Sequence, residues 1–209
     1  PNPIPVIPNP FQIKNEIANI HPWLNNSPIV ITFIGKLEKR KGLLYLINAI
    51  PKIIKKHPDT IFRFVGKAHE SPVLGMNMQQ YAEKKLSKFQ KNLDFKGYTN
   101  YADIPEVLKN SSICIFPSIW ENFPNVCLEA MAAGRCVIGT NNGGMAEIIE
   151  HKKSGWLISP KSVSEIEDSV LNLLDNKKWI EKIGLIAKQT ISIKYNSSLI
   201  GKETIAYYN

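Results

Sequence analysis

Residues 113–134 read ICIFPSIWENFPNVCLEAMAAG, and this stretch decides the fold class of the chain. The apolar run Ile113–Phe116 is typical of a buried strand, and a loop beginning at Pro117 follows it. A helix is predicted to start near Pro124 and to stop at Gly134. A strand whose carboxyl end leads through a loop into a helix is a unit of an open α/β sheet, and such sheets bind ligands at that edge.

Two carboxylates, Glu121 and Glu129, lie eight residues apart in this loop and helix. A carboxylate only accepts hydrogen bonds, so such a pair suits the hydroxyls of a sugar or a ribose. The free N–H groups of the first helical turn favour an anion such as a diphosphate. The alternative is that both are solvated surface charges, but the apolar neighbours Leu128, Ala130 and Met131 argue against this for Glu129. The stretch therefore predicts a nucleotide-sugar site.

The rest of the chain alternates between strands and helices. Strands are expected at Ile29–Ile34, Thr60–Val65, Leu93–Phe95, Ile113–Phe116, Cys136–Gly139 and Gly155–Ile158. Helices are expected at Gly42–His57, Met76–Gln90, Ala102–Asn110 and Asn125–Ala133, and in a short stretch ending at Ile149. Three more are expected between Ser162 and Asn209. Pro51 predicts a kink or a local break in the first of these helices. This alternation predicts an α/β fold with a doubly wound, mostly parallel sheet of about six strands and a helical C-terminal tail.

The length of 209 residues allows one large domain or two small ones. Cys114, Cys127 and Cys136 lie in apolar sequence, which favours reduced core thiols in the cytosol over a disulfide framework or a metal site. No run approaches the roughly 18 apolar residues of a membrane span. The chain starts at Pro1 without a charged and then apolar leader, so we expect a cytoplasmic protein and a fragment of a longer one.

The net charge of +8 points weakly to anionic partners. The lysines fall mostly on one face of each expected helix, and solvated helix faces explain most of them. Peripheral contact with acidic lipids at the inner face of the membrane is the alternative. The apolar stripe Trp179, Ile180, Ile183 and Ile186 among lysines fits either core packing or a membrane interface. No nucleic-acid partner is expected, since zinc-finger spacing, a basic zipper and an aromatic RNA-binding signature are all absent.

Three loops follow three of the expected strands, which places them at one edge of the sheet. They are Gly35–Gly42, Gly66–Pro72 and Glu121–Asn125. In the first loop, Lys36 and Lys41 could meet phosphates that also contact the helix N-terminus beyond Gly42. A basic loop taken singly is more often exposed to solvent. This one is not a P-loop, because Gly-Lys-Ser/Thr is absent.

The motifs of the chain resemble, in order, those of family 4 glycosyltransferases. They are Gly35-Lys36-Leu37 with Lys41-Gly42, Phe64-Val65-Gly66, Phe95–Tyr98, Phe116-Pro117-Ser118, the pair Glu121 and Glu129 followed by Ala-Met-Ala-Ala-Gly, and Gly143–Glu147. Each motif alone is modestly specific, but all six in the same order would rarely occur by chance. Val6–Asn9 resembles the hinge of that family, so the resemblance covers essentially the whole chain.

This resemblance implies the C-terminal, Rossmann-like half of a GT-B enzyme, with residues 1–10 as hinge, 11–190 as donor-binding domain and 191–209 as a helix packing back toward a missing N-terminal domain. Such an enzyme would be a retaining glycosyltransferase of hexosyltransferase type in polysaccharide biosynthesis, with no metal or other cofactor. The donor would be a UDP-, GDP- or ADP-sugar. A glycan or lipid-linked acceptor would bind mainly the N-terminal domain, so the isolated fragment would be inactive.

The same resemblance implies the roles of single residues. Catalytic roles fall to Lys36, Lys41 and Glu121, with Lys41 on the donor diphosphate and Glu121 on the sugar. Lys36 stands where the family more often has arginine; lysine keeps the charge and loses the bidentate fork. Donor-binding roles fall to Gly35, Gly66, Tyr98 (a stacking ring for the base), Asn122, Phe123, Pro124 and Asn125 (through their backbone), Val126, and Glu129 (on the ribose).

Two other function classes stay open at this point. One is a GT-B relative with other chemistry, such as a sugar-nucleotide epimerase or a phosphorylase, although no pyridoxal lysine site is identifiable. The other is a binding-only module that has kept the fold and lost turnover, which Lys36 favours. The sequence does not identify the sugar, the base or the acceptor.

Overall fold

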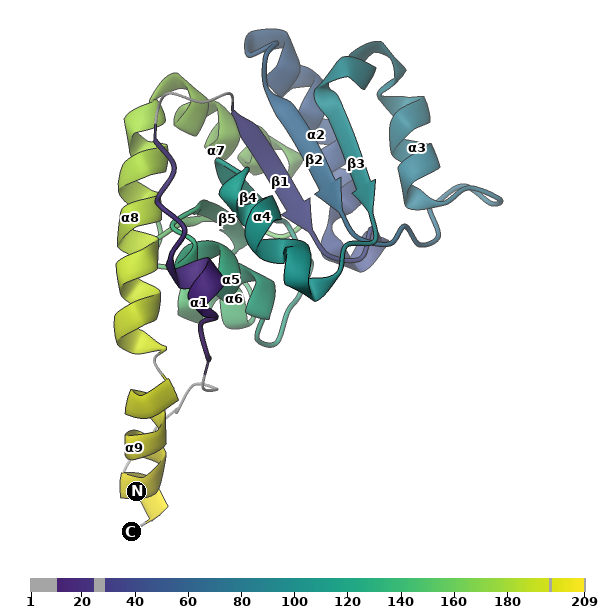
Figure 1. Ribbon diagram of the computed structural model, residues 1–209. Helices are drawn as coiled ribbons and strands as arrows, with labels where there is room; N and C mark the ends of the chain where they lie inside the picture. The colour runs from purple at the N-terminus through teal and green to yellow at the C-terminus, as the bar shows by residue number, and fades with distance from the viewer. Residues whose placement is uncertain (1–10, 25–28, 196, 209) are drawn as a thin grey trace.

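The computed structural model describes residues 11–24, 29–195 and 197–208, and its centre is one parallel sheet (Figure 1). The strands run in the order β3-β2-β1-β4-β5-β6, and every neighbouring pair is parallel. Their bounds are Val30–Ile34 (β1), Ile61–Val65 (β2), Leu93–Gly97 (β3), Ile113–Phe116 (β4), Cys136–Thr140 (β5) and Trp156–Ile158 (β6). The predicted doubly wound sheet is confirmed. The hinge predicted at 1–10 lies outside the described residues.

Helices cover both faces of this sheet (Figure 1). They are α1 (Asn15–Ala18), α2 (Leu43–Lys56), α3 (Met78–Lys85), α4 (Ile104–Lys109), α5 (Asn125–Ala132), α6 (Gly144–Ile148), α7 (Val163–Asp175), α8 (Lys177–Lys194) and α9 (Ser197–Tyr208), with short 3₁₀ turns η1 (Lys39–Lys41), η2 (Ser87–Asn92) and η3 (Tyr101–Asp103). One core cluster packs α2, α3 and α7 on the sheet, and the other packs α1, α4, α5 and α6. The long α8 contributes to both clusters.

The long helix predicted at Met76–Gln90 is wrong. The helix α3 ends at Lys85, Leu86 leaves helical geometry at φ −103° and ψ 27°, and a 3₁₀ turn follows. The physical reason lies at Asn92, whose side-chain amide donates to the carbonyls of Pro58 and Thr60 at 2.7 and 2.9 Å. The chain must turn early to bring Asn92 beside the start of β2, so a straight helix cannot continue.

The helix α2 runs from Leu43 to Lys56 without interruption, so of the kink or local break expected at Pro51, the break does not occur. In the tail, α8 runs from Lys177 to Lys194 and so includes residues 190 and 191, between which the domain boundary was predicted. The predicted domain bounds stay predictions. The next helix, α9, extends away from the body of the domain (Figure 1).

The strand order places a switch in chain direction at β1. From β1 the chain moves outward through β2 and β3, and it then returns to lay β4 on the other side of β1. In open α/β sheets the crevice at such a switch, beyond the carboxyl ends of the strands, is where ligands bind. The loops that leave β1, β2 and β4 all meet there.

Candidate functional site

Backbone contacts hold the loops after β1, β2 and β4 against each other at the switch. The N–H of Ile119, in the β4 loop, donates to the carbonyl of Arg40 in the β1 loop at 2.9 Å. Gly66, the first residue after β2, lies against Gly35, the first after β1. A Cβ at Gly66 would lie 2.0 Å from the carbonyl oxygen of Gly35, and its φ of +140° suits glycine. Gly66 is therefore explained by close backbone packing that shapes the crevice.

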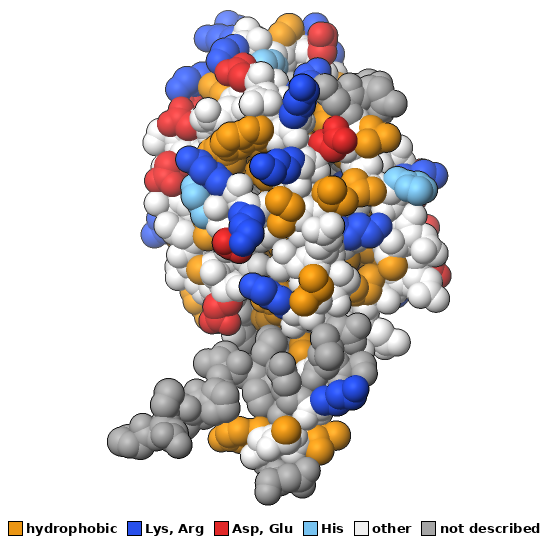
Figure 2. Space-filling view, turned by 90° about the vertical axis from the view of Figure 1, so that its left-hand side faces the viewer, with side chains coloured by type: hydrophobic (Ala, Val, Ile, Leu, Met, Phe, Trp, Pro, Cys, Tyr) orange, Lys and Arg blue, Asp and Glu red, His pale blue; other side chains and the backbone are white. Residues whose placement is uncertain are grey.

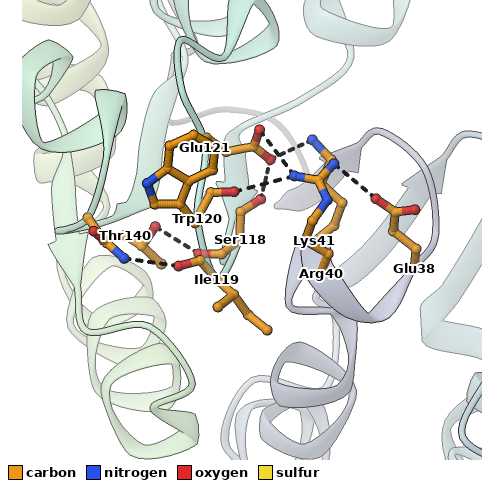
Figure 3. Close-up of polar contacts among 9 residues, drawn as sticks. Glu38, Arg40, Lys41, Ser118, Ile119, Trp120, Glu121 and Thr140 are labelled. Carbon is orange, nitrogen blue, oxygen red and sulfur yellow. Dashed lines mark hydrogen bonds and ion pairs between the residues drawn. The ribbon is translucent and has the colours of Figure 1, made fainter.

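Glu121 is the centre of a polar cluster that joins the β1 and β4 loops (Figure 3). Its Oε1 accepts from Lys41 Nζ at 2.5 Å and from the Ser118 hydroxyl at 2.8 Å. Arg40 Nη1 lies 3.7 Å from Oε2 of Glu121 and 3.4 Å from the carbonyl oxygen of Trp120. The carboxylate thus holds two cations from η1 at the mouth of the crevice, with its side chain only 12% exposed.

The loop that carries Glu121 is itself supported from β5 and α6. The Thr140 hydroxyl donates to the carbonyl of Ser118 at 2.9 Å, as Figure 3 shows, and the N–H of Gly144 donates to the carbonyl of Glu121 at 2.9 Å. Gly143 has a φ of +59°, and a Cβ there would lie 2.1 Å from the same Glu121 carbonyl oxygen. The motif Gly143–Glu147 therefore serves to fix the backbone of Glu121.

Glu129 has very different surroundings. It lies inside α5 and is 5% exposed, and burial raises the pKa of its carboxyl group. The Tyr101 hydroxyl donates to its Oε1 at 2.8 Å and works against that shift, as does the positive charge of Lys14. Lys14 Nζ lies 3.6 Å from the centre of the Tyr101 ring. The buried Glu129 carboxylate is therefore contacted by a neutral donor, Tyr101, and the cation Lys14 lies on the ring of that tyrosine.

A cavity of about 380 Å³ lies between these loops at the carboxyl ends of β1 and β4. Its walls are formed by Ile34, Gly35, Lys36, Arg40, Lys41, Tyr98, Thr99, Tyr101, Ile104, Val126 and Glu129. The structure thus brings Gly35, Lys41, Val126 and Glu129 to one crevice. Lys36 is exposed and makes no hydrogen bond or ion pair with any described residue.

A second, more apolar cavity of about 460 Å³ adjoins the first and shares Lys36 and Tyr98 with it. Val65, Gly66 and His69 complete part of its wall. The ring of Tyr98 is 75% exposed at the border between the two cavities. An apolar space beside an exposed tyrosine ring can accommodate an aromatic group by packing and stacking, and the base-stacking role of Tyr98 stays a prediction.

Glu121 borders the first cavity through its contact with Lys41. None of the four residues that follow it forms part of the walls of either cavity. Pro124 is the buried cap of α5, and the ring of Phe123 lies 6.1 Å from that of Tyr195 in the core. Asn122 and Asn125 are exposed. Any contribution of these residues would come from the backbone at the start of α5, which is how their roles were predicted.

Sequence reasoning assigned no role to three residues that the structure brings to the site. Arg40 immediately precedes Lys41, and its charge in the same loop was a usable signal. Ser118 lay inside a recognised motif. The rule that a buried charge needs a partner indicated that Glu129 has a hydrogen-bond donor, but it did not identify which residue. Tyr101 is 28 residues away in sequence, so no local pattern links the two.

The model of the family described as glycosyl transferases group 1 matches residues 14–190. The chain belongs to this family. It is 32% identical over 181 residues to an uncharacterised glycosyltransferase of Methanocaldococcus jannaschii, covering 86% of this chain and 44% of the relative. It is 28% identical over 187 residues to the UDP-Gal:α-D-GlcNAc-diphosphoundecaprenol α-1,3-galactosyltransferase of Escherichia coli, covering 85% of this chain and 46% of that enzyme. The chain thus spans less than half the length of these curated relatives.

Solved structures show the same architecture. The C-terminal domain of the group 1 glycosyl transferase LpcC from Francisella tularensis superposes with a TM-score of 0.73 at 29% identity, covering 80% of this chain and 86% of that one. HepE of Anabaena in complex with UDP-glucose superposes with a TM-score of 0.70 at 22% identity, covering 91% of this chain and 50% of that one. The GT-B C-terminal architecture implied by the sequence motifs is confirmed.

The face formed by α8 shows lysines interleaved with apolar side chains (Figure 2). In the stripe considered for membrane contact, Ile180 and Ile183 are buried in the core, and Trp179 packs on Trp156 with ring centres 5.9 Å apart. Half of the stripe is therefore core, whereas Trp179 is 39% exposed and Ile186 is half-buried. No helix in the described ranges has the length and apolarity to cross a membrane. Cytoplasmic location and peripheral membrane contact stay predictions.

Proposed function

We propose that this chain is the donor-binding part of a retaining glycosyltransferase that uses a nucleotide-diphosphate sugar. One observation carries the proposal: the crevice at the switch between β1 and β4 gathers Lys36, Lys41 and Glu129 around one cavity, with Glu121 against Lys41. Cations and a buried carboxylate side by side match a ligand that is anionic at one end and rich in hydroxyls at the other.

The cations are placed to hold the diphosphate. Cleavage of the bond to the anomeric carbon leaves negative charge on the nucleoside diphosphate. Lys36 and Lys41 would stabilise that charge, together with the N–H groups at the start of α5, so the interaction grows toward the transition state and lowers the barrier. Glu121 holds Lys41 in the crevice before the donor arrives, and the incoming phosphate would share this lysine.

The remaining donor groups have matching partners. Glu129 would accept hydrogen bonds from the ribose hydroxyls, and Tyr98 would stack on the base in the apolar cavity. The acceptor hydroxyl would attack from the face that the leaving group departs, passing its proton to a phosphate oxygen, which retains the anomeric configuration. The E. coli relative is named for transfer from UDP-galactose, and HepE was solved with UDP-glucose; both support a nucleotide-sugar donor.

A thermal-shift screen with UDP, GDP, ADP and their sugars tests this proposal on the 209-residue chain. A ligand that binds only the native state raises the unfolding temperature, and saturation near 100 times Kd adds about 2.7 kcal/mol. We expect one base to stand out, with the diphosphate stabilising more than the nucleoside. Glu129→Ala should abolish most of the shift, whereas Glu150→Ala, which removes an exposed carboxylate paired only with Lys153 among the described residues, should leave it intact.

Failure of all three nucleotides to stabilise the chain would overturn donor binding at this site. If binding is found, activity of the parent chain that contains this domain separates the classes. Sugar transfer with retention supports the proposal. Epimerisation of the nucleotide sugar, or tight binding without turnover, would instead favour one of the two alternative classes.

A further inference from the structure

The environment of Glu129 raises a question that its ribose role does not answer. A carboxylate that is 5% exposed is costly to keep ionised unless a donor reaches it. Among the described residues, only the Tyr101 hydroxyl donates to it, at 2.8 Å and to Oε1. The other oxygen, Oε2, accepts no hydrogen bond from a described residue. Glu129 and Tyr101 both line the 380 Å³ cavity, so one carboxylate oxygen is engaged and the other is available.

Tyr101 is itself held in place from behind. Lys14, which immediately precedes α1, lies with its Nζ 3.6 Å from the centre of the Tyr101 ring, a cation–π distance. The lysine is half-buried, and α1 packs against α4 and α5. Three separate segments therefore converge in a chain of contacts that runs from Lys14 through the ring of Tyr101 to Glu129. Lys36, Arg40 and Lys41 are the other charged groups around the cavity.

We propose that Tyr101 is a positioning residue for Glu129, with Lys14 clamping its ring, so that Oε1 is fixed and Oε2 is presented to the ribose of the donor. The proposal rests on the proposed function, because it concerns the same donor site. A phenol is well suited to this task, since it donates one hydrogen bond without adding a charge that would compete for the diphosphate. The hydrogen bond to Glu129 also raises the pKa of Tyr101, which keeps the donor proton on the phenol.

The clamp has a consequence for ligand choice. The Tyr101 hydroxyl takes up one acceptor site of Oε1 and fixes the orientation of the carboxylate, which leaves Oε2 without a partner among the described residues. A ribose whose hydroxyl meets Oε2 therefore gains from an acceptor that is already oriented. A ligand without ribose hydroxyls gains nothing from it. Loss of the Tyr101 hydroxyl should therefore weaken the ribonucleotide and spare the dideoxynucleotide, a pattern that a merely structural role would not produce.

The test uses calorimetry on the 209-residue chain with UDP, or with whichever of UDP, GDP and ADP binds the unaltered chain best. Tyr101→Phe should weaken the ribonucleotide about 3- to 10-fold, the usual effect of losing one hydrogen bond. Its effect on the 2′,3′-dideoxy form should be under about twofold. Lys14→Gln should also weaken the ribonucleotide, but by less than Tyr101→Phe does. It removes the cation that packs on the Tyr101 ring and leaves the Tyr101 hydroxyl in place.

Tyr81→Phe is the matched control. Tyr81 also carries a lysine over its ring, with Lys85 Nζ 5.6 Å from the ring centre and 3.3 Å from the hydroxyl, and it lies on α3 away from the cavity. Removal of its hydroxyl should leave both affinities unchanged. Since Tyr101 is 56% exposed and keeps its ring in the variant, circular dichroism should show an intact fold for both phenylalanine variants.

A second measurement does not depend on a ligand. Carbon-13 NMR of the glutamate carboxyl groups follows the protonation of Glu129 directly. The Tyr101 hydrogen bond favours the ionised carboxylate, so Tyr101→Phe should raise the pKa of Glu129 further, and Tyr81→Phe should leave it alone.

The outcomes separate the two proposals. If no nucleotide binds the unaltered chain, the donor site fails and the positioning role fails with it. If the unaltered chain binds the nucleotide and Tyr101→Phe leaves that affinity unchanged, only the role of Tyr101 is overturned. The same holds if Tyr101→Phe weakens the ribonucleotide and the dideoxynucleotide equally. Tighter ribonucleotide binding by Tyr101→Phe would also overturn it, since the phenol would then be competing with the ribose for Glu129.

Discussion

The two carboxylates Glu121, in the loop before α5, and Glu129, inside α5, are eight residues apart and have different surroundings. Glu121 is held by Lys41, Ser118 and Arg40 at the mouth of the crevice. Glu129 lies in the wall of α5 with a phenol as its only donor among the described residues. The first carboxylate therefore acts on the protein's own cations, and the second is available to a ligand. Their spacing in sequence does not reveal this division, because it is created by the loops and helices packed around each one.

This comparison predicts which part of a ligand senses each residue. Changes at Glu129 should affect any ligand that contains a ribose, with or without phosphates. Changes at the cations near Glu121 should affect only the phosphates. Nucleoside and nucleoside diphosphate are therefore the informative pair of ligands.

The largest effect is expected for Glu129→Ala. Loss of a charged hydrogen-bond partner should weaken binding of both nucleoside and nucleoside diphosphate by about 1–3 kcal/mol. Calorimetry with both ligands measures this, with Glu150→Ala as the control for removal of a carboxylate. Unchanged affinity in a folded Glu129→Ala variant would rule out the ribose role and remove the basis of the comparison.

A smaller and more selective effect is expected for Lys41→Ala. The diphosphate should lose about 1–2 kcal/mol of binding free energy, and the nucleoside should lose none. Lys52→Ala is the matched control, since Lys52 makes a similar ion pair with Glu167 at 2.7 Å on the surface. Equal losses for the two ligands would show that Lys41 acts on the fold or on the ribose pocket.

The third prediction concerns pH and folding stability. Burial raises the pKa of Glu129 above its ordinary value of 4.5, so the folded chain takes up the proton before the unfolded chain does. The resulting stabilisation is fully present below that ordinary value and is lost as pH rises through the folded-state pKa. Urea unfolding should therefore show the unaltered chain losing stability relative to Glu129→Gln over this window, by at most about 1.4 kcal/mol per pH unit. Parallel pH profiles for the two chains would contradict the buried, ionisable carboxylate.

The sequence predicted the sheet well, because its strands are short apolar runs ended by glycine or polar loops. All six strands were placed within two residues of their ends, and parallel order followed from the helices between them. The failure at Met76–Gln90 has a physical cause. Most of residues 78–90 favour a helix, and the turn after Lys85 is imposed by contacts of Asn92 with the residues just before β2.

The site was predictable to the extent that it follows from strand ends. Gly35, Lys41 and Glu129 meet because the loops after parallel strands share one edge. The partners of the carboxylates were not predictable. Tyr101 on η3 reaches Glu129, and Lys14 before α1 reaches the Tyr101 ring, through packing that no periodic pattern in the sequence predicts. Binding and catalytic roles of the predicted residues stay predictions.

The smallest effect is expected at Lys36, which has no partner among the described residues. If it meets the diphosphate as a point charge, Lys36→Arg should preserve binding or tighten it by up to about 0.5–1 kcal/mol, because the guanidinium adds a second hydrogen bond to the same phosphate. Lys36→Ala should cost the diphosphate about 0.5 kcal/mol, as for other exposed charges, and cost the nucleoside nothing. Calorimetry at low salt measures both, with Lys55→Ala on the exposed surface of α2 as the control.

Salt sharpens the comparison between the two lysines. Screening lengths shorten from about 30 Å at 0.01 M to about 8 Å at 0.15 M ionic strength, and exposed charges are screened most. The Lys36 effect should therefore shrink strongly as salt is raised. The Lys41 effect should persist, since that side chain is only 20% exposed and is held by Glu121. A Lys36 effect that is absent at low salt would leave Lys41 and the N-terminus of α5 as the phosphate anchors of this crevice. A Lys36 effect that survives high salt would mean that donor binding closes the crevice over this residue and removes it from solvent.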